Sequence, residues 1–338
     1  MVGWPGSPGD RATPRHGTMI LPEVALDPLG LDVQGPNVVA IGGGHGLAQV
    51  LEGVQVYAGD IVAIVTVADD GGSSGRLTST LAIPPPGDIR KCLLALSPEP
   101  SIWRELFSYR FDTTDVAGHS LGNLMLAALQ DVFDGDFPTA VRVAGSLLGA
   151  RGEVIPVAPR SLHLRAEIDG RWVDGQAAIA RTRGTIRALC LEPDDESASA
   201  DALRAIRMAD QVILGPGSLF TSLISALMVP GIVEAIDQAS GRLIFVANLT
   251  TQDGETLSLD GIGHLAALQQ MTGLTRTGVI VAHHGDLDVP EPVRQLEYEA
   301  EEVETFGWHL VEEDLADVGS GWPQHDPIKL GKTLGELV

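Results

Sequence analysis

The sequence predicts an α/β fold: a Rossmann-like, doubly wound, mostly parallel sheet that carries a small antiparallel β insertion. Three observations predict it. Short β-branched apolar runs end in glycine or polar residues and are followed by helix-like segments, which is the βαβ rhythm. These runs are apolar on both faces, as buried parallel strands are. Between about residues 151 and 192 the pattern changes to polar–apolar alternation around an Asp-Gly pair, which is typical of a hairpin.

Each element follows from its local pattern. The first strand covers 37–41, ends in the glycine turn 42–46 and leads into a helix near 47–51. Helical periodicity after the second strand predicts further helices at about 88–96, 101–109, 120–132 and 137–147. Apolar runs predict the remaining parallel strands at 61–68, 211–214, 243–248 and 278–283. The acidic stretch 291–318 fits a solvated edge element, and 326–338 a terminal helix.

The chain of 338 residues is predicted to contain one domain preceded by an N-terminal extension. Residues 1–36 are rich in proline and glycine and lack the pattern of a secretory signal, which predicts a disordered N-terminal extension. Residues 37–338 are predicted to form a single Rossmann-like domain that includes the insertion.

Composition excludes several classes of function. The net charge of −23 argues against nucleic-acid binding and against an anionic membrane surface. The longest apolar runs are about nine residues, whereas a membrane span needs roughly twenty, so no span is expected. The two cysteines, Cys92 and Cys190, offer no disulfide framework, and a reducing cytoplasm is predicted.

The glycine turn at 42–46 is the first candidate anion site, because glycine lets the backbone approach a phosphate and the following helix presents free N–H groups. It lacks the dinucleotide fingerprint: the third glycine position is Leu47, or Gln49 in the alternative register. A nicotinamide dinucleotide enzyme is therefore disfavoured. A tight turn without a ligand is the alternative interpretation.

A second polar loop follows the second strand and begins with Asp69 and Asp70. Ser73 and Ser74 can donate hydroxyl hydrogen bonds, and Arg76 can bind a phosphate with two N–H groups. The Asp pair could instead hold Mg²⁺ through water. A capped turn with a surface arginine is the structural alternative.

Three further segments place glycine or polar residues before a helix or after a strand. Residues 118–122 match the G-x-S-x-G pattern of a serine hydrolase, but no buried strand precedes them, so Ser120 is expected to cap a helix or to donate to an anion. Ser218 in the Gly-Pro-Gly-Ser turn at 215–218 and Asn248 occupy similar positions after strands. The segment 331–333 imitates a phosphate loop but lacks its first glycine.

Taken together, five motifs resemble one family over roughly residues 37–338. They are IGGGHG at 41–46, VADDGGSSGR at 67–76, PGDIR at 86–90, GHSLGN at 118–123 and LGPGS at 214–218. This combination resembles the gluconeogenesis factor family, relatives of the 2-phospho-L-lactate transferase of deazaflavin-cofactor synthesis. The resemblance implies a cytoplasmic regulator that binds UDP sugars, notably UDP-N-acetylglucosamine, and that supports cell shape and wall growth under gluconeogenic conditions.

The resemblance also implies which residues bind the ligand. They are Gly43, Gly44, His45, Gly46, Asp69, Asp70, Ser73, Ser74, Arg76, His119, Ser120, Asn123, Gly215, Gly217, Ser218 and Asn248. Three positions depart from the family pattern: His45 stands where Thr is common, Lys91 where Asn is common and Gln324 where Arg is expected. The last departure concerns a pyrophosphate contact from the C-terminal segment.

Two hypotheses about function stay open at this point. The first is a non-catalytic sensor that signals to a wall-synthesis or regulatory protein partner, with possible homo-oligomers. The second is a phospholactate transferase acting on a deazaflavin with Mg²⁺, in which Asp70 or Asp88 would be the catalytic carboxylate and Asp70 the metal ligand. No cofactor other than the UDP sugar and optional Mg²⁺ is expected.

Overall fold

Seven parallel strands form the main sheet of the computed structural model, which describes residues 34–68, 83–112, 116–317, 319 and 321–338. The strands are β1 (Val38–Gly42), β2 (Ile61–Val65), β3 (Glu153–Pro156), β7 (Gln211–Leu214), β8 (Arg242–Val246), β9 (Val279–His283) and β10 (His309–Glu313). Their order in the sheet is β10-β9-β8-β7-β1-β2-β3. Numbered along the chain, this is the Rossmann order extended by one edge strand, so the predicted fold class is confirmed.

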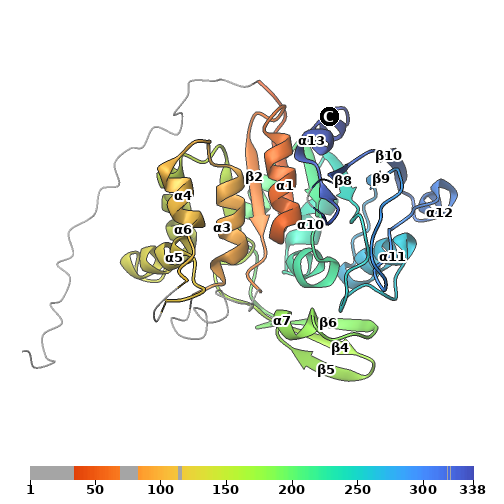
Figure 1. The fold of residues 1–338 in the computed structure, drawn as a ribbon, viewed down its shortest axis with the longest axis horizontal. Helices are drawn as coiled ribbons and strands as arrows, with labels where there is room; N and C mark the ends of the chain where they lie inside the picture. The colour runs from red at the N-terminus through yellow and green to blue at the C-terminus, as the bar shows by residue number, and fades with distance from the viewer. Residues whose placement is uncertain (1–33, 69–82, 113–115, 318, 320) are drawn as a thin grey trace, which may run out of the picture. The chain divides into compact units, whose positions relative to one another are not determined.

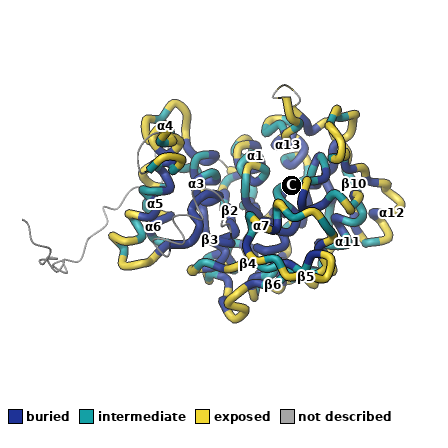
Figure 2. Tube along the Cα trace, turned by 60° about the horizontal axis from the view of Figure 1, so that its bottom comes forward, coloured by how far each residue is buried: buried dark blue, intermediate teal, exposed yellow. Residues whose placement is uncertain are grey.

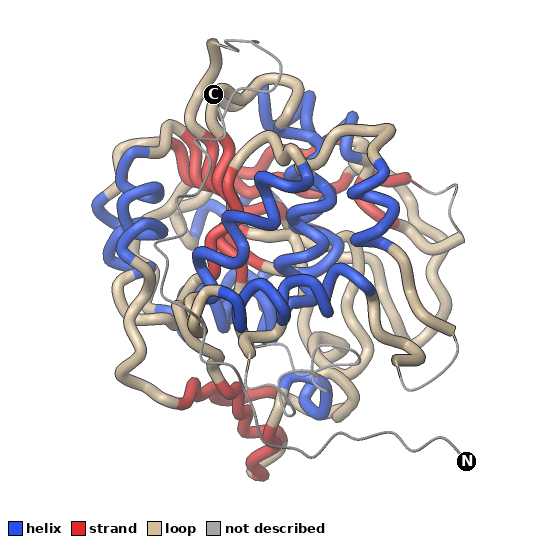
Figure 3. The backbone as a smooth tube through the Cα atoms, turned by 90° about the vertical axis from the view of Figure 1, so that its left-hand side faces the viewer, coloured by secondary structure: helices blue, strands red, loops and turns tan. Residues whose placement is uncertain are grey.

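Helices cover both faces of this sheet, as Figures 1 and 3 show. One face is covered by α1 (Gly44–Val54), α3 (Pro86–Ala95), α4 (Ile102–Ser108), α5 (Leu121–Val132), α6 (Phe137–Leu148) and α13 (Pro327–Gly335). The other is covered by α8 (Ala200–Met208), η1 (Leu219–Ile224), α9 (Ser225–Leu227), α10 (Ile232–Gln238), α11 (Gly261–Thr272) and α12 (Ala300–Thr305).

The central strand shows why its apolar run is needed. Val38 and Ala40 of β1 belong to the hydrophobic core on the α1 face of the sheet. Val39 and Ile41 belong to the core on the opposite face, beneath η1 and α10. All four are at most 2% exposed, because strand side chains alternate between two covered faces. The inner strands β1, β2 and β7 are accordingly buried along most of their length, whereas the edge strand β10 is partly exposed (Figure 2).

The antiparallel insertion is smaller than predicted. It contains β4 (His163–Ile168), β5 (Arg171–Asp174), the short α7 (Gln176–Ile179) and β6 (Ile186–Glu192), in the order β5-β4-β6. Residues 153–156, which the prediction placed in the insertion, form β3 and pair in parallel with β2. The insertion lies at the carboxyl end of the main sheet (Figure 1), where Leu162 N–H donates to the Val67 carbonyl at 3.2 Å.

The C-terminal segment returns to the sheet after its last strand. Two short strands, β11 (Ala316–Asp317) and β12 (Gln324–His325), pair before α13, and α13 packs against α1. The predicted edge element and terminal helix are thus β10 and α13. No single helix of the described chain is long and apolar enough to cross a membrane; η1–α9 and α10 meet such a test only as a pair bent by 72°.

Candidate functional site

The site is built where β1 and β7 lie next to each other, because their connecting helices leave on opposite faces of the sheet. In Rossmann sheets this switch point opens a crevice at the carboxyl ends of the strands. Here β1 ends in the glycine turn at 42–46, and β7 ends in the Gly-Pro-Gly-Ser turn at 215–218. Two turns that are far apart in the sequence therefore meet at one point.

The two turns touch through their backbones, which explains why both need glycine. A Cβ on Gly46 would lie 2.7 Å from the Pro216 carbonyl oxygen. A Cβ on Gly217, whose φ is +155°, would lie 2.9 Å from the Gly43 carbonyl oxygen. The predicted ligand residues Gly43, Gly44, Gly46, Gly215 and Gly217 are thus brought together by the fold.

Helix α1 presents its N-terminus to this crevice. Its N-cap is Gly43, which supplies no side-chain cap, and its first turn contains no acidic residue. The first N–H groups of a helix lack intrahelical partners, and the helix dipole favours an anion there. Gly44, His45 and Gly46 form this first turn. The geometry suits a phosphate or diphosphate group.

Asn248, which follows β8, holds the turn at 215–218 through hydrogen bonds to Gly217. Its Nδ2 donates to the Gly217 carbonyl at 2.9 Å, and its Oδ1 accepts from the Gly217 N–H at 3.2 Å. Ser218 follows at the start of η1 and makes no side-chain capping bond there. Its backbone carbonyl accepts from Leu223 N–H at 3.0 Å, a π-type bond that widens the turn, and such turns are frequent at functional sites.

A cleft of about 560 Å³ opens between these turns and the C-terminal segment. This volume falls within the roughly 300–1,000 Å³ of small-molecule sites. Polar side chains and backbone groups line much of it. The lining residues are His45, Gly46, Gln49, Pro216, Gly217, Asn248, Leu249, Thr250, Thr251, Gln252, Asp253, Val293, Trp322, Pro323, Gln324 and His325.

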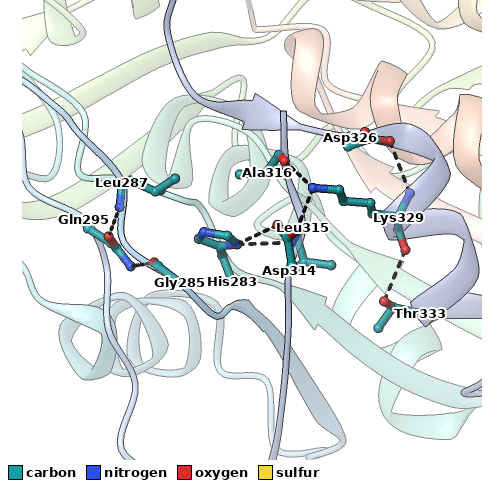
Figure 4. Close-up of polar contacts among 10 residues, drawn as sticks. All are labelled: His283, Gly285, Leu287, Gln295, Asp314, Leu315, Ala316, Asp326, Lys329 and Thr333. Atoms are coloured by element: carbon teal, nitrogen blue, oxygen red, sulfur yellow. Dashed lines mark hydrogen bonds and ion pairs between the residues drawn. The ribbon is translucent and has the colours of Figure 1, made fainter. Parts of the chain in front are cut away.

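The C-terminal wall of the cleft is held by the contacts in Figure 4. His283, at the end of β9, accepts from Leu315 N–H through Nδ1 at 3.1 Å. Lys329 of α13 donates to Asp314 at 2.7 Å and to the Ala316 carbonyl at 2.8 Å. Burial lowers the pKa of His283, so its ring is a neutral acceptor at pH 7. These bonds fix the segment that carries Trp322 to His325.

The GHSLGN motif lies on the other side of α1, at the N-terminus of α5. Ser120 is fully buried and caps α5 by accepting from Asn123 N–H at 3.2 Å, so the expected capping role is observed. Asn123 Oδ1 accepts from Arg90 Nε at 3.0 Å. His119, half-buried, pairs through its backbone with Phe111. Ser120 itself forms an isolated antiparallel bridge with Arg110, and among the described residues no strand of the main sheet directly precedes it.

Asp88 stands in the first turn of α3, directly behind the glycine turn. A Cβ on Gly43 would lie 2.6 Å from its Oδ2, and its Oδ1 accepts from Lys91 Nζ at 2.9 Å. The predicted loop residues Asp69, Asp70, Ser73, Ser74 and Arg76 lie outside the described residues. Within the described part of the site, no group of His, Cys, Asp and Glu is arranged to hold Mg²⁺. Asp88, the described candidate carboxylate, is already bonded to Lys91.

Sequence reasoning pointed to the far wall of the cleft at Asn248 and Gln324, but it assigned no ligand role to the other residues there. Thr250, Gln252, Trp322 and His325 lie in loops or short strands without glycine motifs. Gln49 faces this wall from α1, and its Nε2 donates to Gln324 Oε1 at 3.1 Å. The polar run 248–252 was the signal for Thr250 and Gln252, since loops after parallel strands meet at one edge of the sheet. Trp322 and His325 carry no such signal.

Comparison with known proteins gives the family. A model of the 2-phospho-L-lactate transferase CofD family matches residues 38–316. The chain belongs to the CofD family. Within it, the chain is 38% identical over 314 residues to the gluconeogenesis factor of Bacillus subtilis, covering 90% of this chain and 99% of that one. It is 43% identical to the gluconeogenesis factor of Halalkalibacterium halodurans over 249 residues, covering 73% and 77%.

Solved structures of the CofD family have the same fold. The X-ray crystal structure of a protein from Bacillus halodurans matches with a TM-score of 0.86 and 35% identity, covering 89% of this chain and 99% of that one. The resemblance to the gluconeogenesis factors, first drawn from five motifs, is therefore confirmed over most of the chain.

The loop beneath the cleft carries a buried carboxylate whose ionisation is testable. Glu255 is 1% exposed, and Thr221 Oγ1 donates to its Oε1 at 2.6 Å. Burial raises the pKa of Glu255, while the Thr221 hydrogen bonds oppose the rise. Folded Glu255 therefore holds its proton more tightly than unfolded Glu255, whose pKa is roughly 4.3. The free energy of unfolding is unaffected below that pH and falls as pH rises from there through the folded pKa.

We therefore expect Glu255→Gln, which stays uncharged, to lose less stability than the wild type as pH rises above about 4.5. Urea unfolding at a series of pH values measures this difference. The solvent-exposed Glu304→Gln is the matched control and should follow the wild type. Parallel stability profiles for wild type and Glu255→Gln would contradict the assignment.

Proposed function

We propose that this chain binds UDP-N-acetylglucosamine in the cleft between the glycine turns and the C-terminal segment. The observation that carries the proposal is the meeting of the α1 N-terminus with the Gly217 turn at the mouth of a polar cleft. The diphosphate would bind the N–H groups of Gly44 to Gly46, with the nucleoside lying toward Asn248 and Thr250.

The C-terminal side of the cleft, with Trp322 and Gln324, has groups that could contact a ligand longer than a phosphate. Trp322 is 43% exposed and lines the cleft, where an aromatic face can stack on a base or a sugar. Thr250, Gln252 and Gln324 supply side-chain donors and acceptors suited to ribose and base hydroxyl, amide and carbonyl groups. Gln324 is uncharged, so in this proposal the helix N-terminus carries most of the diphosphate recognition.

The regulatory part of the proposal rests on the family and on one connection to the insertion. The relatives are named gluconeogenesis factors, which supports a role in gluconeogenic growth. Asp253 of the cleft loop forms two bonds with Arg183 of the insertion, at 2.7 and 2.8 Å. The insertion would thereby signal ligand occupancy to a protein partner of wall synthesis, in the cytoplasm, with effects on cell morphology.

Isothermal titration with UDP-N-acetylglucosamine, with and without Mg²⁺, tests this function. We expect micromolar binding, about −8 kcal/mol. Chromatography of the ligand after the titration should recover it unchanged. UMP, which lacks the diphosphate, should bind at least tenfold more weakly because it leaves the α1 N-terminus partly unfilled. Equal affinity for UMP and UDP-N-acetylglucosamine would contradict the proposed orientation.

A transferase is the second candidate function, because the matching family is described by 2-phospho-L-lactate transferase. The chain would then join phospholactate to a deazaflavin acceptor from a nucleotide-activated donor. Asp70→Asn should stop turnover if Asp70 serves this reaction. Absence of product with Mg²⁺, donor and deazaflavin would remove this candidate.

A further inference from the structure

Four large apolar side chains lie exposed together on helix α4 and its C-cap, far from α12 (Figure 1). They are Ile102, Trp103, Leu106 and Tyr109, and their exposed fractions are 64%, 39%, 36% and 51%. Scattered apolar residues are normal on a protein surface, whereas a contiguous group marks an interaction site. We call these four residues the α4 apolar surface.

The spacing of these residues gives α4 two apolar sides. Ile102, Leu106 and Tyr109 recur at i, i+4 and i+7, which places them in one stripe along the helix. Phe107 lies on another side of the helix, is fully buried and belongs to the core on the α1 face of the sheet. A helix with apolar residues on both sides is normally covered on both. The described part of the chain covers Phe107 and leaves the stripe open to a second molecule.

Helix α4 is held firmly against its neighbours, so the stripe is a fixed surface. A Cβ on Gly122 of α5 would lie 2.6 Å from the Phe107 carbonyl oxygen, which shows how closely α5 approaches α4. On the side facing α3, Arg104 donates to the carbonyl oxygens of Leu94 and Ser97. A surface that is already ordered loses little conformational entropy on binding, which favours docking.

The charges beside the stripe indicate which kind of partner fits. Three carboxylates and one cation are exposed on or next to α4, namely Glu99, Glu105, Asp112 and Arg110. Glu105 follows Ile102 by three residues and precedes Tyr109 by four, so it borders the middle of the stripe. In a two-fold pair of α4 helices the middle residues face their own copies, so two Glu105 carboxylates would meet. This repulsion, in a chain whose net charge is −23, disfavours a second copy and favours a cationic partner.

We propose that the α4 apolar surface docks an amphipathic helix of a partner protein, one whose apolar face is bordered by Lys or Arg. The stripe packs against the partner's apolar face as the ridges of one helix fit the grooves of another. Trp103 and Tyr109 are of the residue types that most often dominate the affinity of an interface. A cation of the partner pairs with Glu105 and sets the orientation of the docked helix. The proposal goes beyond the proposed function and does not depend on the ligand in the cleft.

Two synthetic helical peptides of about 18 residues test the proposal by fluorescence anisotropy with the full chain. Both carry the same leucine stripe, and their polar positions are Lys in one and Glu in the other. We expect saturable binding of the lysine peptide, at least tenfold tighter than binding of the glutamate peptide.

Variants of the chain locate the binding surface. Ile102→Ser/Leu106→Ser should weaken binding of the lysine peptide at least tenfold. The matched control, Val56→Ser/Met208→Ser, removes two apolar side chains from exposed positions elsewhere and should bind like the wild type. Urea unfolding of both double variants verifies that they are folded.

Equal binding of the two peptides, or equal weakening in both double variants, would overturn the proposal, because the attraction would then be non-specific. Sedimentation velocity tests for a second copy: a wild-type dimer that Ile102→Ser/Leu106→Ser dissociates would overturn it too. Binding of phosphatidylcholine vesicles through α4, without binding of the lysine peptide, would assign the surface to a membrane instead. Titration with UDP-N-acetylglucosamine keeps the two proposals apart, because a wild type that fails to bind it would remove the proposed function and leave the docking surface.

Discussion

Gly217→Ala will abolish measurable UDP-N-acetylglucosamine binding and lower the free energy of unfolding by about 1–3 kcal/mol. The added Cβ would lie 2.9 Å from the Gly43 carbonyl oxygen, and the residue's φ of +155° is strained for any side chain. Neither group can move alone, because both belong to backbone turns. Relief of the contact would push the β7 turn away from the α1 N-terminus and misplace the N–H groups there.

Isothermal titration and urea unfolding measure the two effects of Gly217→Ala. Gly145→Ala is the control, because that glycine lies within α6 and its added Cβ would meet Leu93 at an ordinary 3.4 Å. It should bind like the wild type and be equally or slightly more stable, since alanine is favoured in helices. Full binding by Gly217→Ala would show that the two turns do not form the ligand site.

Asn248→Ala will weaken UDP-N-acetylglucosamine binding by at least tenfold, or about 1.4 kcal/mol. Its amide makes two hydrogen bonds with the backbone of Gly217, at 2.9 and 3.2 Å. Alanine leaves the part-buried Gly217 carbonyl and N–H without these partners, and a typical hydrogen bond contributes about 0.5–1.5 kcal/mol. Without these bonds the turn at 215–218 would sample several conformations, and only some of them would keep it in contact with the α1 N-terminus.

The same titration measures Asn248→Ala, with Asn37→Ala as the matched control. Asn37 bonds Asp210 through its backbone N–H and lies at the opposite end of the sheet, before β1 begins. Its substitution should leave the affinity unchanged. An Asn248→Ala protein with wild-type affinity would mean that the β8 end plays no part in forming the site.

Much of the fold follows from short-range patterns. The run 37–41 was predicted as a strand because every residue from Val38 is β-branched or small and apolar, and β1 has both faces covered. The helix start at Ser120 was predicted because its side chain can cap, and it does. The helix at 137–147 was predicted from its periodicity, and the structure adds Asp136 as its N-cap. The limit of the insertion was not readable at residues 153–156, since a short apolar run does not reveal which strand it pairs with.

The βαβ order, the family and the glycine turns could all be predicted from the sequence, because they depend on local periodicity and on residue types with special backbone freedom. Three contacts could be seen only in the folded chain: Asn248 holds Gly217 through two hydrogen bonds, Gln49 donates to Gln324, and Arg90 donates to Asn123. These contacts join residues up to 275 positions apart. They are set by how the strands pair and how the loops at one edge of the sheet converge, which no local pattern encodes.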